Sequence, residues 1–148
     1  DMKSIYLYPA TCYFEATPVS LGRGTSLPFQ VYGHPNMTGY NYSFTPKSIP
    51  GAKNPPQLNK LCHGVNLSNM SNEEIWERGV DLSYVIDAYK NLNMGDHFFR
   101  PFFELLVGTD YVRKMIEDGK SAGEIKSRWK GDVEKFKEQR KPYLLYQE

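Results

Sequence analysis

The sequence predicts an α+β fold, in which an irregular, strand-containing N-terminal half packs on a helical C-terminal half. Residues 1–70 are rich in Gly, Pro, Asn, Thr and Tyr, and turn residues separate their short β-like runs. Residues 71–146 instead carry apolar residues at helical spacing, with capping residues between the segments. The length of 148 residues suits one domain, residues 1–148, with a core of its own.

Four short runs in the first half, separated by turn residues, predict strands. They are Ser4–Tyr8, Phe29–Gly33, Tyr42–Pro46 and Leu61–Leu67. The segment Ser48–Lys60 contains three prolines and has no periodicity, so we expect an ordered loop or arm there.

Amphipathic patterns and caps predict the helices of the second half. Asp81–Leu92 carries one apolar stripe at i, i+3, i+4 and i+7, and Phe98–Val107 is apolar enough to be buried. Thr109 is placed to cap a helix over Asp110–Asp118, which Gly119 would stop.

The last predicted helix begins at a capping box, Ser121 to Glu124, and ends near Lys141, before Pro142. We expect its core side to be Ile125, Trp129, Val133 and Phe136. The short apolar tail Tyr143–Tyr146 is expected to dock back on the body.

Charge and hydropathy exclude several classes of partner. The 18 basic and 17 acidic side chains leave a net charge of +1, which offers no electrostatic footprint for nucleic acid or an anionic membrane. No apolar run is long enough to span a bilayer, and residues 1–8 do not resemble a signal peptide. Because the chain starts at Asp1 with a predicted strand, we expect it to be a piece of a longer protein, cut at a domain boundary, and an export signal would then lie elsewhere.

The cysteines and histidines give no strong signal for a metal or a cofactor, and we expect neither. Cys12 and Cys62 lack zinc-like spacing, so two partly buried free thiols are favoured, although they could pair in an exported protein. His34, His63 and His97 are scattered and are interpreted as ordinary loop histidines.

The segment Phe14–Phe29, FEATPVSLGRGTSLPF, concentrates the residues that suit chemistry. Glu15 lies between apolar neighbours, which would favour acid/base use of its carboxyl group, so we consider it a candidate catalytic residue. Arg23, between two glycines, offers a planar fork of donors for a carboxylate or paired sugar oxygens. The remaining candidate substrate-binding residues are three hydroxyl side chains and one aromatic ring: Thr17, Ser20, Thr25 and Phe29.

The residues alone leave a structural alternative open. Glu15 and Arg23 could form an ion pair that staples an irregular loop, with the glycines serving a turn. One carboxylate is not a complete glycosidase site, because that chemistry usually needs two. The high aromatic content, 14%, is likewise explained either by carbohydrate contact or by packing on a sheet.

Residues 8–35, YPATCYFEATPVSLGRGTSLPFQVYGHP, resemble the signature of the bacterial exo-β-N-acetylmuramidase family, long known only as a domain of unknown function. The resemblance continues through Phe44–Pro46, Cys62–Val65, Phe102–Trp129 and Phe136–Tyr146, which is nearly the whole chain. It departs from the family pattern at Ala16, where a glycine is usual.

The resemblance implies an exo-acting glycoside hydrolase that releases N-acetylmuramic acid from peptidoglycan fragments. It also implies an N-terminal Rossmann-like domain outside this chain, with a principal catalytic carboxylate on it and the substrate cleft between the two domains. The six candidate residues named above occupy matching positions of the C-terminal domain. We expect an exported protein of the periplasm or cell envelope. The alternatives are a non-catalytic glycan-binding module and a structural interaction domain.

Overall fold

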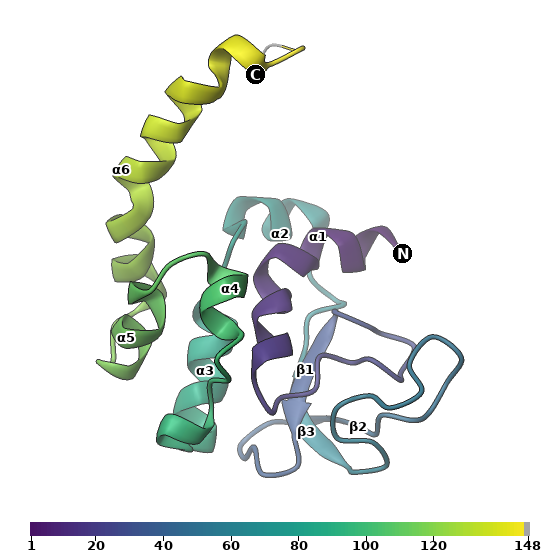
Figure 1. The fold of residues 1–148 in the computed structure, drawn as a ribbon. Helices are drawn as coiled ribbons and strands as arrows, with labels where there is room; N and C mark the ends of the chain where they lie inside the picture. Colours follow the sequence, from purple (N-terminus) through teal and green to yellow (C-terminus); the bar gives the residue numbers. More distant parts are fainter. Residues whose placement is uncertain (147–148) are drawn as a thin grey trace.

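The computed structural model describes residues 1–146 and confirms the α+β class. A small antiparallel sheet of order β1-β3-β2 lies at one end, and the helices stack beside it and away from it (Figure 1). Its strands are β1 (Val31–His34), β2 (Tyr42–Phe44) and β3 (Cys62–Asn66), close to three of the predicted runs.

The N-terminal run is a helix, α1 (Met2–Thr11), so the prediction of a strand at Ser4–Tyr8 was wrong. The side chain of Asp1 caps this helix by accepting a hydrogen bond from the Lys3 amide. Leu7 and Ala10 lie three residues apart and are both buried, which is helical rather than alternating spacing. A run of five residues is too short for its periodicity to distinguish the two states.

The remaining helical elements follow in chain order, with the two capping boxes at Ser71 and Ser121 formed in full. The predicted helix over Asp81–Leu92 is confirmed as α3. The elements are η1 (Cys12–Ala16), α2 (Asn72–Arg78), α3 (Ser83–Leu92), η2 (Gly95–His97), α4 (Phe103–Val107), α5 (Tyr111–Glu117), α6 (Ala122–Arg140) and η3 (Lys141–Tyr143).

Two details of the helical half differ from expectation. The apolar segment Phe98–Val107 is buried only in part, because Phe102 and Leu105 are exposed. Within residues 1–146 no side chain caps α5, and the buried hydroxyl of Thr109 has no hydrogen-bond partner, so the predicted Thr109 cap was wrong. Gly119 does end this segment, with a φ of +79°.

Helix α6 projects from the body instead of lying on it (Figure 1). Ile125 is fully buried and Trp129 packs against the core, but Val133 and Phe136 are exposed. The tail Tyr143–Tyr146 is exposed as well. The expectations that Val133 and Phe136 face the core and that the tail docks on the body were therefore wrong for this chain.

Aromatic side chains fill much of the core, which explains a large part of their abundance. Phe14 stacks on Tyr32 with the ring centroids 4.8 Å apart, and Phe98, Phe99 and Phe103 pack in a chain of ring contacts. Phe14 thus fixes the start of the Phe14–Phe29 segment in the core.

A carboxylate at the edge of this core ties the sheet to α3. Tyr32 and Tyr40 each donate a hydrogen bond to Asp87, at 2.9 and 2.7 Å. Burial, followed by the neighbouring Asp87, raises the pKa of both phenols above the ordinary value. Both tyrosines therefore remain protonated donors at neutral pH.

Candidate functional site

The Phe14–Phe29 segment begins within η1 and continues alongside β1 as an ordered loop. The backbones of Ser20 and Gly33 exchange two hydrogen bonds of 2.9 Å, which add a short bridge to the sheet. Val19 and Leu21, on either side of Ser20, are buried. The loop is therefore held by both the sheet and the core, which gives its exposed side chains a rigid base.

The two glycines around Arg23 are required by the backbone. Gly22 and Gly24 have φ values of +78° and +81°, in the left-handed region that disfavours other residues. A Cβ atom on Gly24 would lie 2.4 Å from the carbonyl oxygen of Lys47, which immediately precedes Ser48–Lys60, here called the proline-rich segment. The predicted turn is therefore present, and it holds the loop in close contact with the backbone of Lys47.

Glu15 and Arg23 form the ion pair that the structural alternative anticipated. Nη2 of Arg23 donates to Oε1 of Glu15 at 2.5 Å, and the two side chains keep 42% and 24% of their surface exposed. The guanidinium carbon also lies 4.8 Å from the centroid of the Phe29 ring. Among the described residues this is the only hydrogen bond of the Arg23 side chain. Its other N–H donors are thus left for a ligand.

Phe29 completes this arrangement in a strained conformation. Its φ of +63° is a rare value for a bulky residue. Its amide donates to the carbonyl of Leu21 at 2.8 Å, and the ring of Tyr8 lies 5.0 Å from its own. Strain of this kind persists where the surroundings impose it, and such positions cluster at functional sites.

Tyr8 is a candidate site residue that the sequence analysis missed. Its side chain is 45% exposed, and with Phe29 and Pro28 it lines a shallow surface groove along α1. The strand assigned to Ser4–Tyr8 concealed it, and its contact with Phe29 joins residues 21 positions apart, so no local spacing in the sequence indicates it.

Of the three predicted hydroxyl contacts, Thr17 and Ser20 are buried and Thr25 is partly buried. Thr17 donates to the carbonyl of Phe14 and accepts from the amide of Val19, and Thr25 makes the equivalent pair of bonds to Gly22 and Leu27. Ser20 is fully buried, and its hydroxyl has no hydrogen-bond partner among the described residues. Contact of these three side chains with substrate stays a prediction.

The departure from the family pattern at Ala16 carries no backbone strain. Ala16 is fully buried, and its φ is not positive. Its carbonyl accepts a 2.9 Å hydrogen bond from the amide of Arg100, which joins the loop to the helical half. An alanine is therefore compatible with this loop.

Both cysteines are free thiols in the structure, and burial raises the pKa of Cys62 to about 11. The pKa of Cys12 is raised by burial and then by the charge of Glu15.

In residues 1–146, no three His, Cys, Asp or Glu side chains cluster as metal ligands would. None of the helices described in this range is long and apolar enough to cross a membrane.

The strain at Phe29 leads to a prediction about stability. At ordinary φ, replacing alanine with glycine destabilises a protein by about 0.5–1 kcal/mol. At position 29 we expect the opposite order, with Phe29→Gly more stable than Phe29→Ala by about 1 kcal/mol, because only glycine adopts positive φ without strain. Urea denaturation of the two variants tests this. An alanine variant that is the more stable of the two would show that the backbone relaxes once the ring is removed.

Comparison with known proteins extends the resemblance over the whole chain. Residues 6–146 match the family model described as "Exo-beta-N-acetylmuramidase NamZ, C-terminal". The chain is 32% identical over 158 aligned positions to the peptidoglycan beta-N-acetylmuramidase NamZ of Bacillus subtilis (strain 168), with 98% of this chain and 38% of that protein covered.

A solved structure agrees with the family match. A DUF1343 family protein from Bacteroides fragilis NCTC 9343 superposes with a TM-score of 0.99 at 82% identity, over 100% of this chain and 42% of that one. The chain thus spans about two fifths of the length of these relatives. It belongs to the family of the C-terminal domain of the exo-β-N-acetylmuramidase NamZ.

Proposed function

We propose that this chain is the C-terminal part of an exo-acting glycoside hydrolase that releases N-acetylmuramic acid from peptidoglycan fragments. Glu15, Arg23 and Phe29 would form one wall of the substrate cleft, and an N-terminal domain outside this chain would form the other. The observation that carries the proposal is the half-exposed Arg23 guanidinium, held between a carboxylate and an aromatic ring. We also propose that the full-length protein is exported, since peptidoglycan, the source of these fragments, lies in the cell envelope.

The chemistry of muramic acid suits this wall. The sugar carries a lactyl carboxylate, and a guanidinium can bind a carboxylate through two parallel N–H donors. The Phe29 ring lies against Arg23, and the ring of Tyr8 packs against Phe29, so this aromatic pair would suit the apolar face of a pyranose ring. The cation would therefore recognise the lactyl group that distinguishes this sugar, and the aromatic surface would bind a ring face that other pyranoses share.

The ion pair bears on whether Glu15 is a catalytic carboxyl group. Glycoside hydrolysis usually requires two carboxyl groups that flank the scissile bond. Glu15 is engaged with Arg23, so we propose that it positions the guanidinium, while the principal catalytic carboxylate lies on the part of the protein outside this chain. A catalytic role for Glu15, as the sequence suggested, stays a prediction. By this proposal the isolated chain lacks turnover.

Glu15→Gln in the full-length protein separates the two roles. Glutamine keeps an acceptor for Arg23 but removes the charge, so a positioning role predicts a loss of about 10-fold in kcat/KM, seen mainly in KM. A catalytic carboxylate predicts a loss of kcat of about 1000-fold or more. Steady-state kinetics on a chromogenic N-acetylmuramic acid glycoside measure both. Unchanged kinetics would contradict both roles and leave the pair a structural staple.

A non-catalytic glycan-binding role is the second candidate. It is favoured by the presence of a single carboxylate at Arg23 in the part of the chain that the structure describes. A full-length protein that binds muropeptides but does not release muramic acid would support this role over hydrolysis.

A further inference from the structure

Helix α6 and the tail expose an apolar surface that nothing in the body covers. From Trp129 to Tyr146 they form an arm, here called the C-terminal arm, of which Trp129, at its base, is the one apolar residue packed against the core among residues 1–146. Phe136 is 60% exposed, and Tyr143, Leu145 and Tyr146 are more exposed still. Exposed apolar residues this close together normally mark a surface that packs against another structure.

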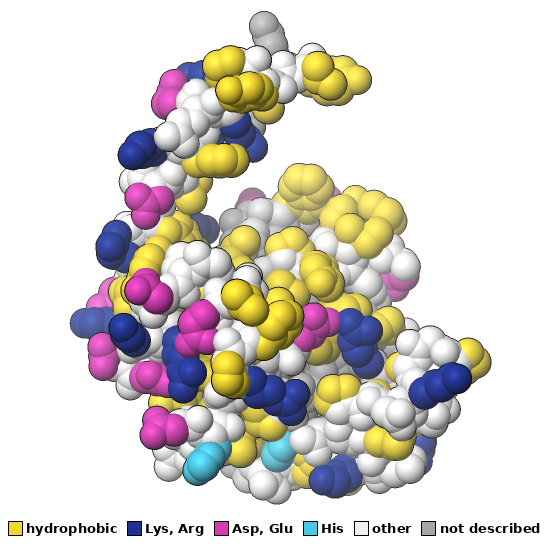
Figure 2. Space-filling view, viewed as in Figure 1, with side chains coloured by type: hydrophobic (Ala, Val, Ile, Leu, Met, Phe, Trp, Pro, Cys, Tyr) yellow, Lys and Arg dark blue, Asp and Glu magenta, His cyan; other side chains and the backbone are white. Residues whose placement is uncertain are grey.

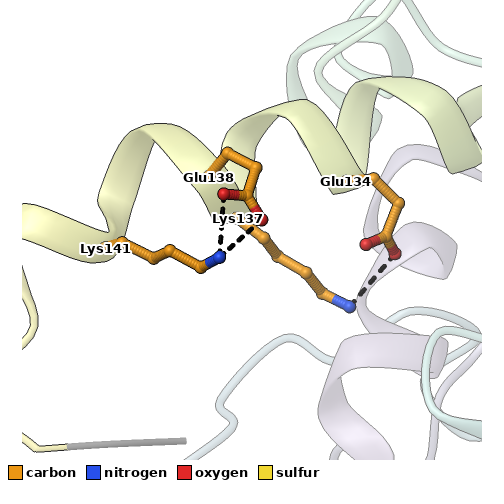
Figure 3. Close-up of polar contacts among 4 residues, drawn as sticks. All are labelled: Glu134, Lys137, Glu138 and Lys141. Atoms are coloured by element: carbon orange, nitrogen blue, oxygen red, sulfur yellow. Dashed lines mark hydrogen bonds and ion pairs between the residues drawn. The ribbon is translucent and has the colours of Figure 1, made fainter.

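The opposite side of α6 is built for solvent. With 3.6 residues per turn, Val133 and Phe136 continue the stripe that begins at Ile125, while Glu134 and Glu138 project from the other side. Figure 3 shows the ion pairs on that side, Lys137 with Glu134 at 3.2 Å and Lys141 with Glu138 at 2.7 Å. The exposed Val133 and Phe136 therefore lie on the side of α6 away from Glu134 and Glu138.

A second uncovered apolar patch lies on the body, where α1 meets α2. Ile5, Trp76 and Val80 are exposed there around a shallow groove, and Trp76 retains 69% of its surface. Figure 2 shows an open gap between the C-terminal arm and the body, with apolar side chains on both sides of it. The two surfaces thus face a common space.

We infer that the C-terminal arm and the α1/α2 patch together clasp the other folded domain of the same polypeptide. The solved relative has this fold over 100% of the chain with a TM-score of 0.99, although the match is only 42% of its length. The arm therefore keeps the same position within a chain more than twice as long. A helix half in solvent has little stability of its own, so a fixed position requires a packing partner. More than half of the longer chain is available to provide it.

Thiol labelling in the full-length protein tests this assignment. Phe136→Cys and Trp76→Cys place a thiol on each surface, and Leu61→Cys is the matched control, because Leu61 is 55% exposed at the far end of the sheet. Maleimide reaction is followed by tandem mass spectrometry that locates the modified residue within each peptide, so that Cys12 and Cys62 are counted separately from the introduced thiol. Rates are divided by those of the same variant in denaturant. We expect both variants to react at least 10-fold more slowly than the control.

The oligomeric state shows whether the other domain of the same polypeptide or a second copy of the protein covers these surfaces. Protection that persists in a monomer, identified by light scattering, supports the clasp. Protection that disappears on dilution through a dimer–monomer transition would assign the surface to a second copy and overturn the inference. Rates equal to that of Leu61→Cys would also overturn it. Labelling does not require turnover, so these outcomes are independent of the proposed hydrolysis.

Discussion

Arg23→Ala in the full-length protein should reduce kcat/KM for an N-acetylmuramic acid glycoside by about 30- to 100-fold. Truncating one partner of a charged hydrogen-bonded pair costs about 2–5 kcal/mol. Because Arg23 is 42% exposed, we take the low end of that range, and each 1.36 kcal/mol corresponds to about tenfold in rate. The loss follows from the lactyl carboxylate, which would no longer meet a cation.

The substrate comparison makes this prediction specific. On the corresponding N-acetylglucosamine glycoside, which has no lactyl group, Arg23→Ala should lower kcat/KM by less than about 3-fold, because the contact it removes is not made there. On the N-acetylmuramic acid glycoside, Arg23→Lys should have a kcat/KM between those of the unmodified protein and Arg23→Ala, since an ammonium keeps the charge but loses the planar fork. Arg100→Ala, at an exposed arginine, is the matched control and should leave both substrates unaffected. Equal losses on both substrates would show that Arg23 maintains the loop rather than recognises the sugar.

The sequence was sufficient for the parts of the fold that local chemistry determines. The α3 stripe, the Ser121 capping box and the stop at Gly119 each depend on residues within a few positions of one another. Glu15 and Arg23 were also correctly paired as one alternative, because both belong to a single short loop. Local spacing and caps thus predicted what local contacts form.

Features that depend on tertiary packing were not predicted. The five residues Ser4–Tyr8 fit either state, and the core contacts of Leu7 decide for helix. The error concealed Tyr8 as a neighbour of Phe29. In α6, Val133 and Phe136 have the spacing of a core stripe, but spacing does not say which body covers it. The positive φ of Phe29 has no sequence signal, since the rest of the loop imposes it.

The largest effect on stability is expected from Gly24→Ala, and Gly39→Ala is its matched control. The two glycines have nearly the same φ, +81° and +83°, so both substitutions introduce the same backbone strain, about 1–2 kcal/mol. The two positions differ in the room available for a Cβ atom. A Cβ on Gly24 would lie 2.4 Å from the carbonyl oxygen of Lys47, whereas a Cβ on Gly39 meets nothing within 4 Å. The difference between the variants therefore isolates the steric contact.

Relieving that contact requires two backbone segments to separate. The Lys47 amide donates to the Gly24 carbonyl at 2.9 Å, and the side chain of Gln57 donates to the carbonyl of Pro18 at the same distance, so the proline-rich segment is bonded to the site loop. Moving backbone in a packed region costs a further 1–3 kcal/mol, roughly. We expect Gly24→Ala to unfold at a lower urea concentration than Gly39→Ala, with a free energy of unfolding about 2 kcal/mol smaller. Because the shift begins next to Arg23, kcat/KM on the muramoside should also fall for Gly24→Ala alone. Two variants with equal stability would show that the loop yields freely at Gly24, and a rigid base for Arg23 would then be wrong.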